Sequence, residues 1–331
     1  MTGSSVRPAR TVRSASRRVR LSLVLLAVVA ACAPMRREGR WPAPAPGEAT
    51  FLPLPGGGEL HYQTAGAGEA LVLIHGGFGD RRMWDDVFLP LADDWAVVRY
   101  DHRGFGRSTR PDAVYSPVRD LLRLLDHLHI GRAYLVGNSL GGELALDFAL
   151  QHPERVAALV MVASGPQGLP VPQAEIDDVL AVFEVARGGD LSGAAERWLA
   201  HPMVAVTRAD PRRAPRLERM VRQNASMFTL PFELWPGEVV STPTSERLER
   251  ISVPTLVIVG TQDVPVVREA AAFAAAGLPD AELVELEGAD HLPQMSQTSR
   301  FLFHVRRFLL ARDAEARAIR AKQEGAARVE R

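Results

Sequence analysis

Residues 133–142, AYLVGNSLGG, decide the fold of this chain of 331 residues. An apolar run that favours a strand leads into the pattern Gly137-x-Ser139-x-Gly141, and a helical pattern follows. A serine between a strand and a helix occupies a tight, strained turn, which requires residues without bulk two positions before and after it. The turn exposes the hydroxyl at a helix N-terminus, where backbone dipoles favour developing negative charge. Ser139 is therefore the candidate nucleophile.

Strands and helices alternate on both sides of this turn. Helical spacing is found at residues 120–129, 143–151 and 301–310, and short apolar runs predict strands at residues 60–64, 70–74, 95–100, 133–136, 156–163, 255–259 and 282–286. Such alternation predicts an α/β fold with a mostly parallel, doubly wound sheet. The core of this fold is expected to comprise residues 51–165 and 251–312.

A serine hydroxyl is a poor nucleophile without a base nearby. Among the nine histidines, His291 follows the last predicted strand and is the candidate base. His304 lies within a predicted helix, and His75 lies in a glycine-rich loop, where a structural hydrogen-bonding role is expected.

The base requires a carboxylate that fixes its tautomer and stabilises the imidazolium. Asp263 lies in the loop after the preceding strand, and the order Ser139, Asp263, His291 is the order of the α/β-hydrolase triad. Asp290 adjoins His291, but an immediate neighbour in sequence usually points elsewhere. We therefore expect Asp263 to be the triad carboxylate.

A tetrahedral oxyanion requires two backbone donors. Leu140, the residue after the candidate nucleophile, is expected to supply one of them. The second is expected from the loop at residues 75–79, HGGFG, with the amide of Gly77 favoured and that of Phe78 as the alternative.

Residues 51–310 resemble the α/β-hydrolase superfamily, in the branch that carries a helical cap. The resemblance rests on residues 75–77, 101–108, 137–142, 254–263 and 288–293. It implies hydrolysis of an ester, lactone, amide, thioester or carbon–carbon bond without a cofactor. It also gives residues 101–108 a mainly structural role.

Departures from the family pattern narrow these activities. Position 139 is Ser and not Asp, which disfavours dehalogenases and epoxide hydrolases. The loop at residues 75–79 lacks the proline of proline iminopeptidases, and Leu292 replaces the tryptophan often found in meta-cleavage product hydrolases. Carboxylesterases, enol-lactonases and cofactor-free haloperoxidases remain. We expect a serine hydrolase that cleaves small apolar esters or lactones through an acyl-enzyme on Ser139.

Two other activities stay open. The first is a carbon–carbon bond hydrolase or a cofactor-free haloperoxidase with the same triad. The second is a ligand-binding protein that keeps the fold without turnover, although all three triad residues are present. No metal site is expected, and the zero formal net charge gives no indication of nucleic acid as a partner.

Residues 166–250 interrupt the alternation, because they show helical patterns without a convincing strand. This insertion is expected to form a helical cap over one end of the sheet. Its large apolar residues could line a substrate pocket, although most are expected simply to pack the cap onto the core: Phe183, Trp198, Met203, Met220, Met227, Phe228, Phe232 and Trp235. Five arginines between residues 212 and 222 could meet an acidic substrate or anionic lipid head groups, but a solvated face is expected.

The N-terminal residues are interpreted as a targeting sequence. A basic leader precedes the apolar run 21–31, which is too short to span a bilayer as a helix of about 20 residues. The run ends in VAAC, residues 29–32, which resembles the lipobox of bacterial lipoproteins, and Cys32 is the only cysteine. We therefore expect residues 1–31 to be a signal peptide and Cys32 to be the site of lipidation.

The alternatives for this leader are an ordinary cleaved signal and an uncleaved anchor. In the lipoprotein interpretation, the proline- and alanine-rich residues 32–50 form a tether. The protein is then exported to the cell envelope and held on a bacterial membrane by its lipid anchor. Residues 313–331 are expected to be a charged tail, either a solvated helix or a disordered end.

This interpretation predicts that Cys32→Ser releases the protein from membranes. Lasting attachment requires two or more acyl chains, and a serine cannot receive the thioether-linked lipid. Fractionation of cells and incorporation of labelled fatty acid provide the measurement: the wild-type protein should be labelled and sediment with membranes. A wild-type protein that stays in the soluble fraction without label contradicts the lipoprotein interpretation.

Overall fold

The structure, a computed structural model, describes residues 41–42, 50–235 and 242–329. The expected signal peptide, Cys32 and most of the expected tether lie outside the described residues. Within the tether, β1 (Trp41–Pro42) pairs in antiparallel fashion with β4 (Ala67–Gly68). None of the described helices is both long enough and apolar enough to cross a membrane.

The centre of the fold is an eight-stranded sheet in the order β10-β9-β8-β7-β5-β6-β3-β2. Its strands are β2 (Thr50–Pro53), β3 (Glu59–Ala65), β5 (Ala70–Ile74), β6 (Ala96–Tyr100), β7 (Ala133–Asn138), β8 (Val156–Val162), β9 (Thr255–Gly260) and β10 (Ala281–Leu286). The pairs β2–β3 and β3–β6 are antiparallel, and the remaining pairs are parallel. The predicted mostly parallel α/β fold is confirmed.

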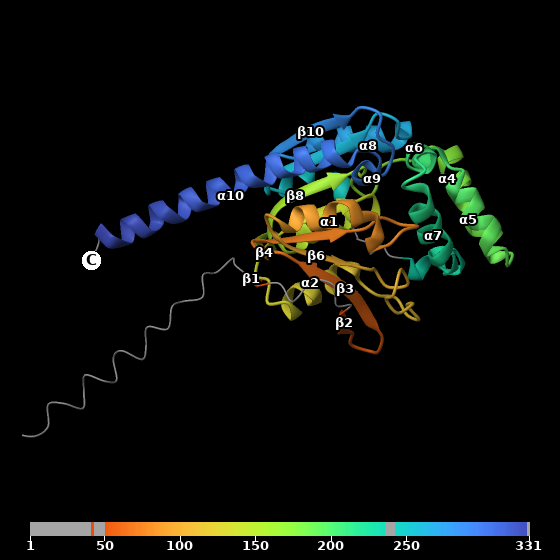
Figure 1. Cartoon of the computed structure of the whole chain (residues 1–331), viewed down its shortest axis with the longest axis horizontal. Helices are drawn as coiled ribbons and strands as arrows, with labels where there is room; N and C mark the ends of the chain where they lie inside the picture. The colour runs from red at the N-terminus through yellow and green to blue at the C-terminus, as the bar shows by residue number, and fades with distance from the viewer. Residues whose placement is uncertain (1–40, 43–49, 236–241, 330–331) are drawn as a thin grey trace, which may run out of the picture. The chain divides into compact units, whose positions relative to one another are not determined.

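Helices cover both faces of the sheet, because its central strands are apolar on both sides (Figure 1). In β5, Leu71 and Leu73 join the core beneath α1 (Asp85–Ala92) and α10 (Thr298–Val329). The alternate residues Val72 and Ile74 join the second core. That core lies beneath α2 (Pro117–His127), α3 (Leu140–Gln151) and α8 (Pro265–Gly277). The period of two along β5 thus supplies both hydrophobic layers.

The inserted segment is helical over its described residues, as the sequence predicts. It contains α4 (Gln173–Arg187), α5 (Leu191–Leu199), α6 (Ala205–Ala209) and α7 (Ala214–Asn224), followed by short 3₁₀ turns. Figure 1 shows these four helices together at one end of the sheet. Four of the five arginines near α7 form ion pairs: Arg212 and Arg213 with Asp210, Arg216 with Asp86, and Arg222 with Glu196.

The beginning of the expected tail is part of the core, which corrects the sequence interpretation. Helix α10 continues through residue 313, and the carboxylate of Asp313 is buried instead of solvated. It accepts hydrogen bonds from Tyr134 Oη at 2.6 Å and from Trp95 Nε1 at 3.1 Å. Both partners lie on or beside the central strands: Tyr134 is in β7, and Trp95 directly precedes β6.

Replacing Asp313 with alanine should lower the free energy of unfolding by about 2–4 kcal/mol, because two buried donors lose their acceptor. Glu315→Ala is the matched control, since Glu315 is exposed and its ion pair with Arg312 contributes at most about 1 kcal/mol. Urea unfolding of both variants gives the comparison. Equal losses in the two variants contradict a structural role for Asp313.

Candidate active site

The turn between β7 and α3 has the close packing that its glycines predict. A Cβ atom on Gly137 would lie 2.1 Å from the Gly141 carbonyl oxygen, and one on Gly141 would lie 2.3 Å from the Ile74 oxygen. Ser139 between them adopts φ 51° and ψ −120°. This conformation is strained for a residue with a side chain and is maintained only by its surroundings.

Hydrogen bonds from neighbouring strands hold this turn in place. The Ser139 amide donates to the Val162 carbonyl at 2.8 Å, and the Ser164 hydroxyl donates to the Ser139 carbonyl at 2.7 Å. The Asn138 side-chain amide donates to the carbonyl of His291 at 3.0 Å. The turn that carries Ser139 is therefore bonded directly to the loop that carries His291.

The structure brings the imidazole of His291 and the carboxylate of Asp263 together. His291 follows β10, Asp263 follows β9, and His291 Nδ1 lies 2.8 Å from Asp263 Oδ2. Burial alone lowers the pKa of His291, but the charge and hydrogen bond of Asp263 outweigh it, with smaller contributions from Asp290 and Glu143. The pKa of His291 is therefore raised above its ordinary value.

Asp290 bonds elsewhere, as its position beside His291 led us to expect. Its oxygens accept hydrogen bonds from the Thr207 amide at 2.7 Å, the Thr207 hydroxyl at 2.9 Å and the Leu292 amide at 3.1 Å. Both Asp290 and Thr207 are fully buried. Asp290 therefore joins the histidine loop to the cap.

The cap also bonds to His291 itself. The backbone amide of His291 donates to the carbonyl of Met203 at 3.0 Å, in the cap segment between α5 and α6. Sequence reasoning missed this contact and the Thr207–Asp290 contact. The first contact joins two backbone groups and leaves no trace in the sequence. The second joins two polar residues, and the sequence does not reveal which polar residues become buried together.

The expected oxyanion residues line the same cavity as Ser139. Gly77 and Phe78 follow β5, Leu140 is the first residue of α3, and all three line one cavity with Ser139. The amide of a first helical residue has no partner within its own helix, so that of Leu140 is free of intrahelical bonding. Phe78 has φ 61° and stacks on the cap residue Trp198 at 3.9 Å between ring centroids.

His75 has the structural role expected for it. Its Nδ1 donates to the Gly76 carbonyl at 2.7 Å, and its Nε2 accepts from the His102 amide at 2.9 Å. Burial lowers the pKa of His75, which favours the neutral ring that this pattern requires. The ring thus joins the loop after β5 to the loop after β6.

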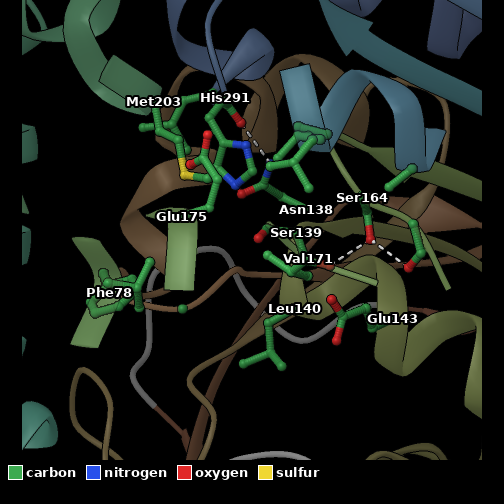
Figure 2. A pocket seen from close by; sticks show the side chains of 18 of the residues that line it. Phe78, Asn138, Ser139, Leu140, Glu143, Ser164, Val171, Glu175, Met203 and His291 are labelled. Carbon is green, nitrogen blue, oxygen red and sulfur yellow. Dashed lines mark hydrogen bonds between the residues drawn. The ribbon is translucent and has the colours of Figure 1, made fainter. Parts of the chain in front are cut away.

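The cavity has a volume of about 820 Å³ and lies between these loops and the cap. Figure 2 shows Ser139 and His291 facing it, with Phe78 on one side of Ser139 and Glu143 on the other. Of the apolar cap residues identified in the sequence, Trp198, Met203, Met220 and Trp235 line the cavity. Phe183, Met227 and Phe228 are buried outside the set of lining residues, and Phe232 is largely exposed.

The charged groups of the cavity are mostly acidic. Glu143, Glu175 and Glu269 line it, and none of the described lining residues is a lysine or an arginine. The described ranges also contain no group of three or more His, Cys, Asp or Glu side chains placed to hold a metal ion.

The family model of the alpha/beta hydrolase fold matches residues 69–298. This match covers the sheet from β5 onward, the cap and the loops that carry Ser139, Asp263 and His291. The chain belongs to the α/β-hydrolase fold family and is a hydrolase by its relatives.

Three relatives illustrate the range of activities in this family. The 2-hydroxymuconate semialdehyde hydrolase of Pseudomonas sp. (strain CF600) is 32% identical over 263 residues, which cover 76% of this chain and 90% of that protein. A thermophilic esterase from Thermogutta terrifontis is similar in structure, with a TM-score of 0.68 and 26% identity, over 81% of this chain and 99% of that protein. The enol-lactonase from Burkholderia xenovorans LB400 is similar with a TM-score of 0.64 and 25% identity, over 79% of this chain and 100% of that protein.

The hydrogen bond between His291 and Asp263 predicts an order of effects on the pKa of His291. Asp263→Asn should lower this pKa most, because it removes both the largest opposing charge and a hydrogen bond. Asp290→Asn should lower it less, because Asp290 acts only through its charge. An NMR titration of the His291 ring, assigned by comparison with His291→Gln, measures both shifts. A larger shift in Asp290→Asn contradicts the arrangement.

Proposed function

We propose that this protein hydrolyses carboxylic esters or lactones through an acyl-enzyme on Ser139. The hydrogen-bonded pair of His291 and Asp263, beside a strained serine that faces the same cavity, carries this proposal. A base oriented by a carboxylate is what a serine hydroxyl needs in order to react as a nucleophile.

In the proposed reaction, Ser139 Oγ attacks the carbonyl carbon of the ester, and His291 Nε2 accepts the hydroxyl proton. The tetrahedral intermediate collapses, the alcohol leaves with the proton from His291, and the acyl group stays on Ser139. A water molecule then attacks the acyl-enzyme with His291 as base, which releases the carboxylic acid and restores the serine. Asp263 keeps the proton of His291 on Nδ1 and stabilises the imidazolium.

The oxyanion of each tetrahedral intermediate would be bound by backbone amides. Leu140 is the first donor, and Gly77 or Phe78 is the second. This role is supported by their place around Ser139 in the cavity and by the position of Leu140 at the N-terminus of α3, whose dipole favours negative charge.

The lining of the cavity supports an apolar substrate of small to medium size. Phe78, Trp198 and Trp235 provide aromatic surface on the cap side, and Met83 and Met220 provide flexible apolar surface beside them. Such a lining can accept acyl groups of different shapes. Residues of this kind give no particular affinity for a peptide or a phosphate ester.

The charge of the cavity favours esters over the substrate of the muconate-type relative. A muconate derivative carries a carboxylate, which a binding site usually pairs with an arginine or a lysine. The described lining residues supply three glutamates and no such cation. This distribution supports ester or lactone hydrolysis in preference to cleavage of a carbon–carbon bond in an anionic substrate.

We further propose that the hydrolase acts at the cell envelope, attached by lipid on Cys32. The support comes from the sequence alone: a basic leader, a short apolar run and a sole cysteine at the end of VAAC. Such an anchor would place the cavity near a membrane surface, where apolar esters accumulate.

A fluorophosphonate probe should label the full-length chain at Ser139, and Ser139→Ala should abolish labelling. The rate of labelling should fall as the pH drops through the raised pKa of His291, because the protonated ring cannot accept a proton. Asp263→Asn should lower kcat for a para-nitrophenyl ester by several orders of magnitude, on the order of 10⁴-fold, without unfolding the protein.

Circular dichroism and unfolding midpoints serve as the control for each variant. Labelling at another residue, or an Asp263→Asn variant with normal turnover, argues against the proposed triad. Labelling without turnover of any ester or lactone favours the ligand-binding alternative.

A further inference from the structure

Glu143 lines the same cavity as Ser139. It lies in the first turn of α3, and Ser139 is the residue that precedes this helix; both line the cavity. Figure 2 shows Glu143 and Ser164 on one side of Ser139 and Phe78 on the other. The cavity therefore has an apolar side beneath the cap aromatics and a polar side along α3.

The carboxylate of Glu143 has no structural partner that would account for it. Among the described residues it forms no hydrogen bond and no ion pair, although it is more than half buried. Its position in the first turn of α3 lets the helix dipole favour its negative charge, but this effect does not bind the carboxylate to a particular group. A carboxylate removed from water without a partner costs stability, so a role toward a ligand is favoured.

The surroundings of Glu143 raise its affinity for protons. Burial and the charge of Asp147, one turn further along α3, raise the pKa of Glu143 to about 7, and the smaller effect of His291 opposes them. Glu175 and Glu269 line the same cavity and add negative charge. A cationic group beside Glu143 would remove the unfavourable burial of its charge and keep the carboxylate ionised at neutral pH.

We propose that Glu143 determines the substrate preference of this cavity by binding a cationic ammonium group, carried by the ester at a short distance from its reactive carbonyl. The inference rests on the proposed ester hydrolysis at Ser139 and narrows its substrate class. The apolar side of the cavity holds the hydrocarbon part of such an ester, and the polar side along α3 holds its ammonium group. An ester with a carboxylate at the same place is repelled.

Matched pairs of esters isolate this charge effect. The first pair is the para-nitrophenyl ester of γ-(trimethylammonio)butyric acid and its carbon isostere, in which tert-butyl replaces trimethylammonium. The second pair is butyrylcholine and its corresponding isostere, which places the cation in the alcohol. The measured quantity is the ratio of kcat/KM for the charged ester to that for the neutral ester, with full-length protein in a non-ionic detergent.

The ratio of the two kcat/KM values isolates the effect of Glu143 from that of the catalytic base. Titration of His291 changes kcat/KM for both members of a pair by the same factor, so it cancels in the ratio. In the wild-type protein, the ratio for at least one pair should rise from about pH 6 to about pH 8, as Glu143 ionises around its pKa of about 7. In Glu143→Gln the ratio should fall about tenfold at the higher pH and lose its pH dependence, since one charge pair in a partly buried site has an effect of this order.

Glu269→Gln is the matched control, because it removes the same charge from an exposed position on the same cavity. Its ratio should change less than about twofold, because solvent screens an exposed charge. A ratio that is unaffected by Glu143→Gln for both pairs overturns the inference, as does a loss that occurs equally in Glu269→Gln. Failure to hydrolyse the neutral isosteres is a different result, because it contradicts the proposed ester hydrolysis itself.

Discussion

The close packing of backbone at the turn between β7 and α3 is the constraint on which the rest of the site depends. Gly137 contacts the backbone of Gly141, and Gly141 contacts the backbone of Ile74 at the end of β5. These contacts bring α3 against the sheet and force Ser139 into its strained conformation. Because β5 and β7 are neighbours, the same packing places the loop of Gly77 and Phe78 beside Ser139.

The cap is bonded to the groups that would perform the reaction, in addition to covering them. The carbonyl of Met203 holds the amide of His291, and Thr207 holds the adjacent Asp290 in a buried environment. The cap residue Trp198 stacks on Phe78 at the opposite side of the site. A displacement of this part of the cap would therefore change the position of the histidine loop as well as the shape of the cavity.

Carboxylates surround His291 on more than one side and determine its acid–base behaviour. Burial disfavours its protonated form, whereas Asp263, Asp290 and Glu143 favour it, and the acidic groups prevail. The cost of burying an imidazolium is thus offset in the place where a proton would be accepted from Ser139. The same arrangement leaves Glu143 as a partly buried acid whose pKa is raised by burial and by the charge of Asp147.

Much of the fold and candidate site could be predicted because the responsible forces act locally. The strand β5 was predicted with its observed bounds from a short apolar run between polar neighbours. The turn at Ser139 was predicted from glycines that a tight strand–helix turn requires. Asp263 was selected over Asp290 because it lies in the loop after the preceding strand, whereas an immediate neighbour of His291 in sequence usually points elsewhere. The four-residue strand β2 was missed, because it is too short to show a period.

The sequence by itself thus determined the alternation of strands and helices, the turn that carries Ser139, and the loops that carry Asp263 and His291. Only the tertiary structure decided which polar groups are buried together. Thr207 meets Asp290 across 83 residues of sequence, and Tyr134 meets Asp313 across 179. The physical reason is that a hydrogen bond between distant segments leaves no periodic signal in either one. Its partners are chosen by the packing of the cap and of α10 against the sheet.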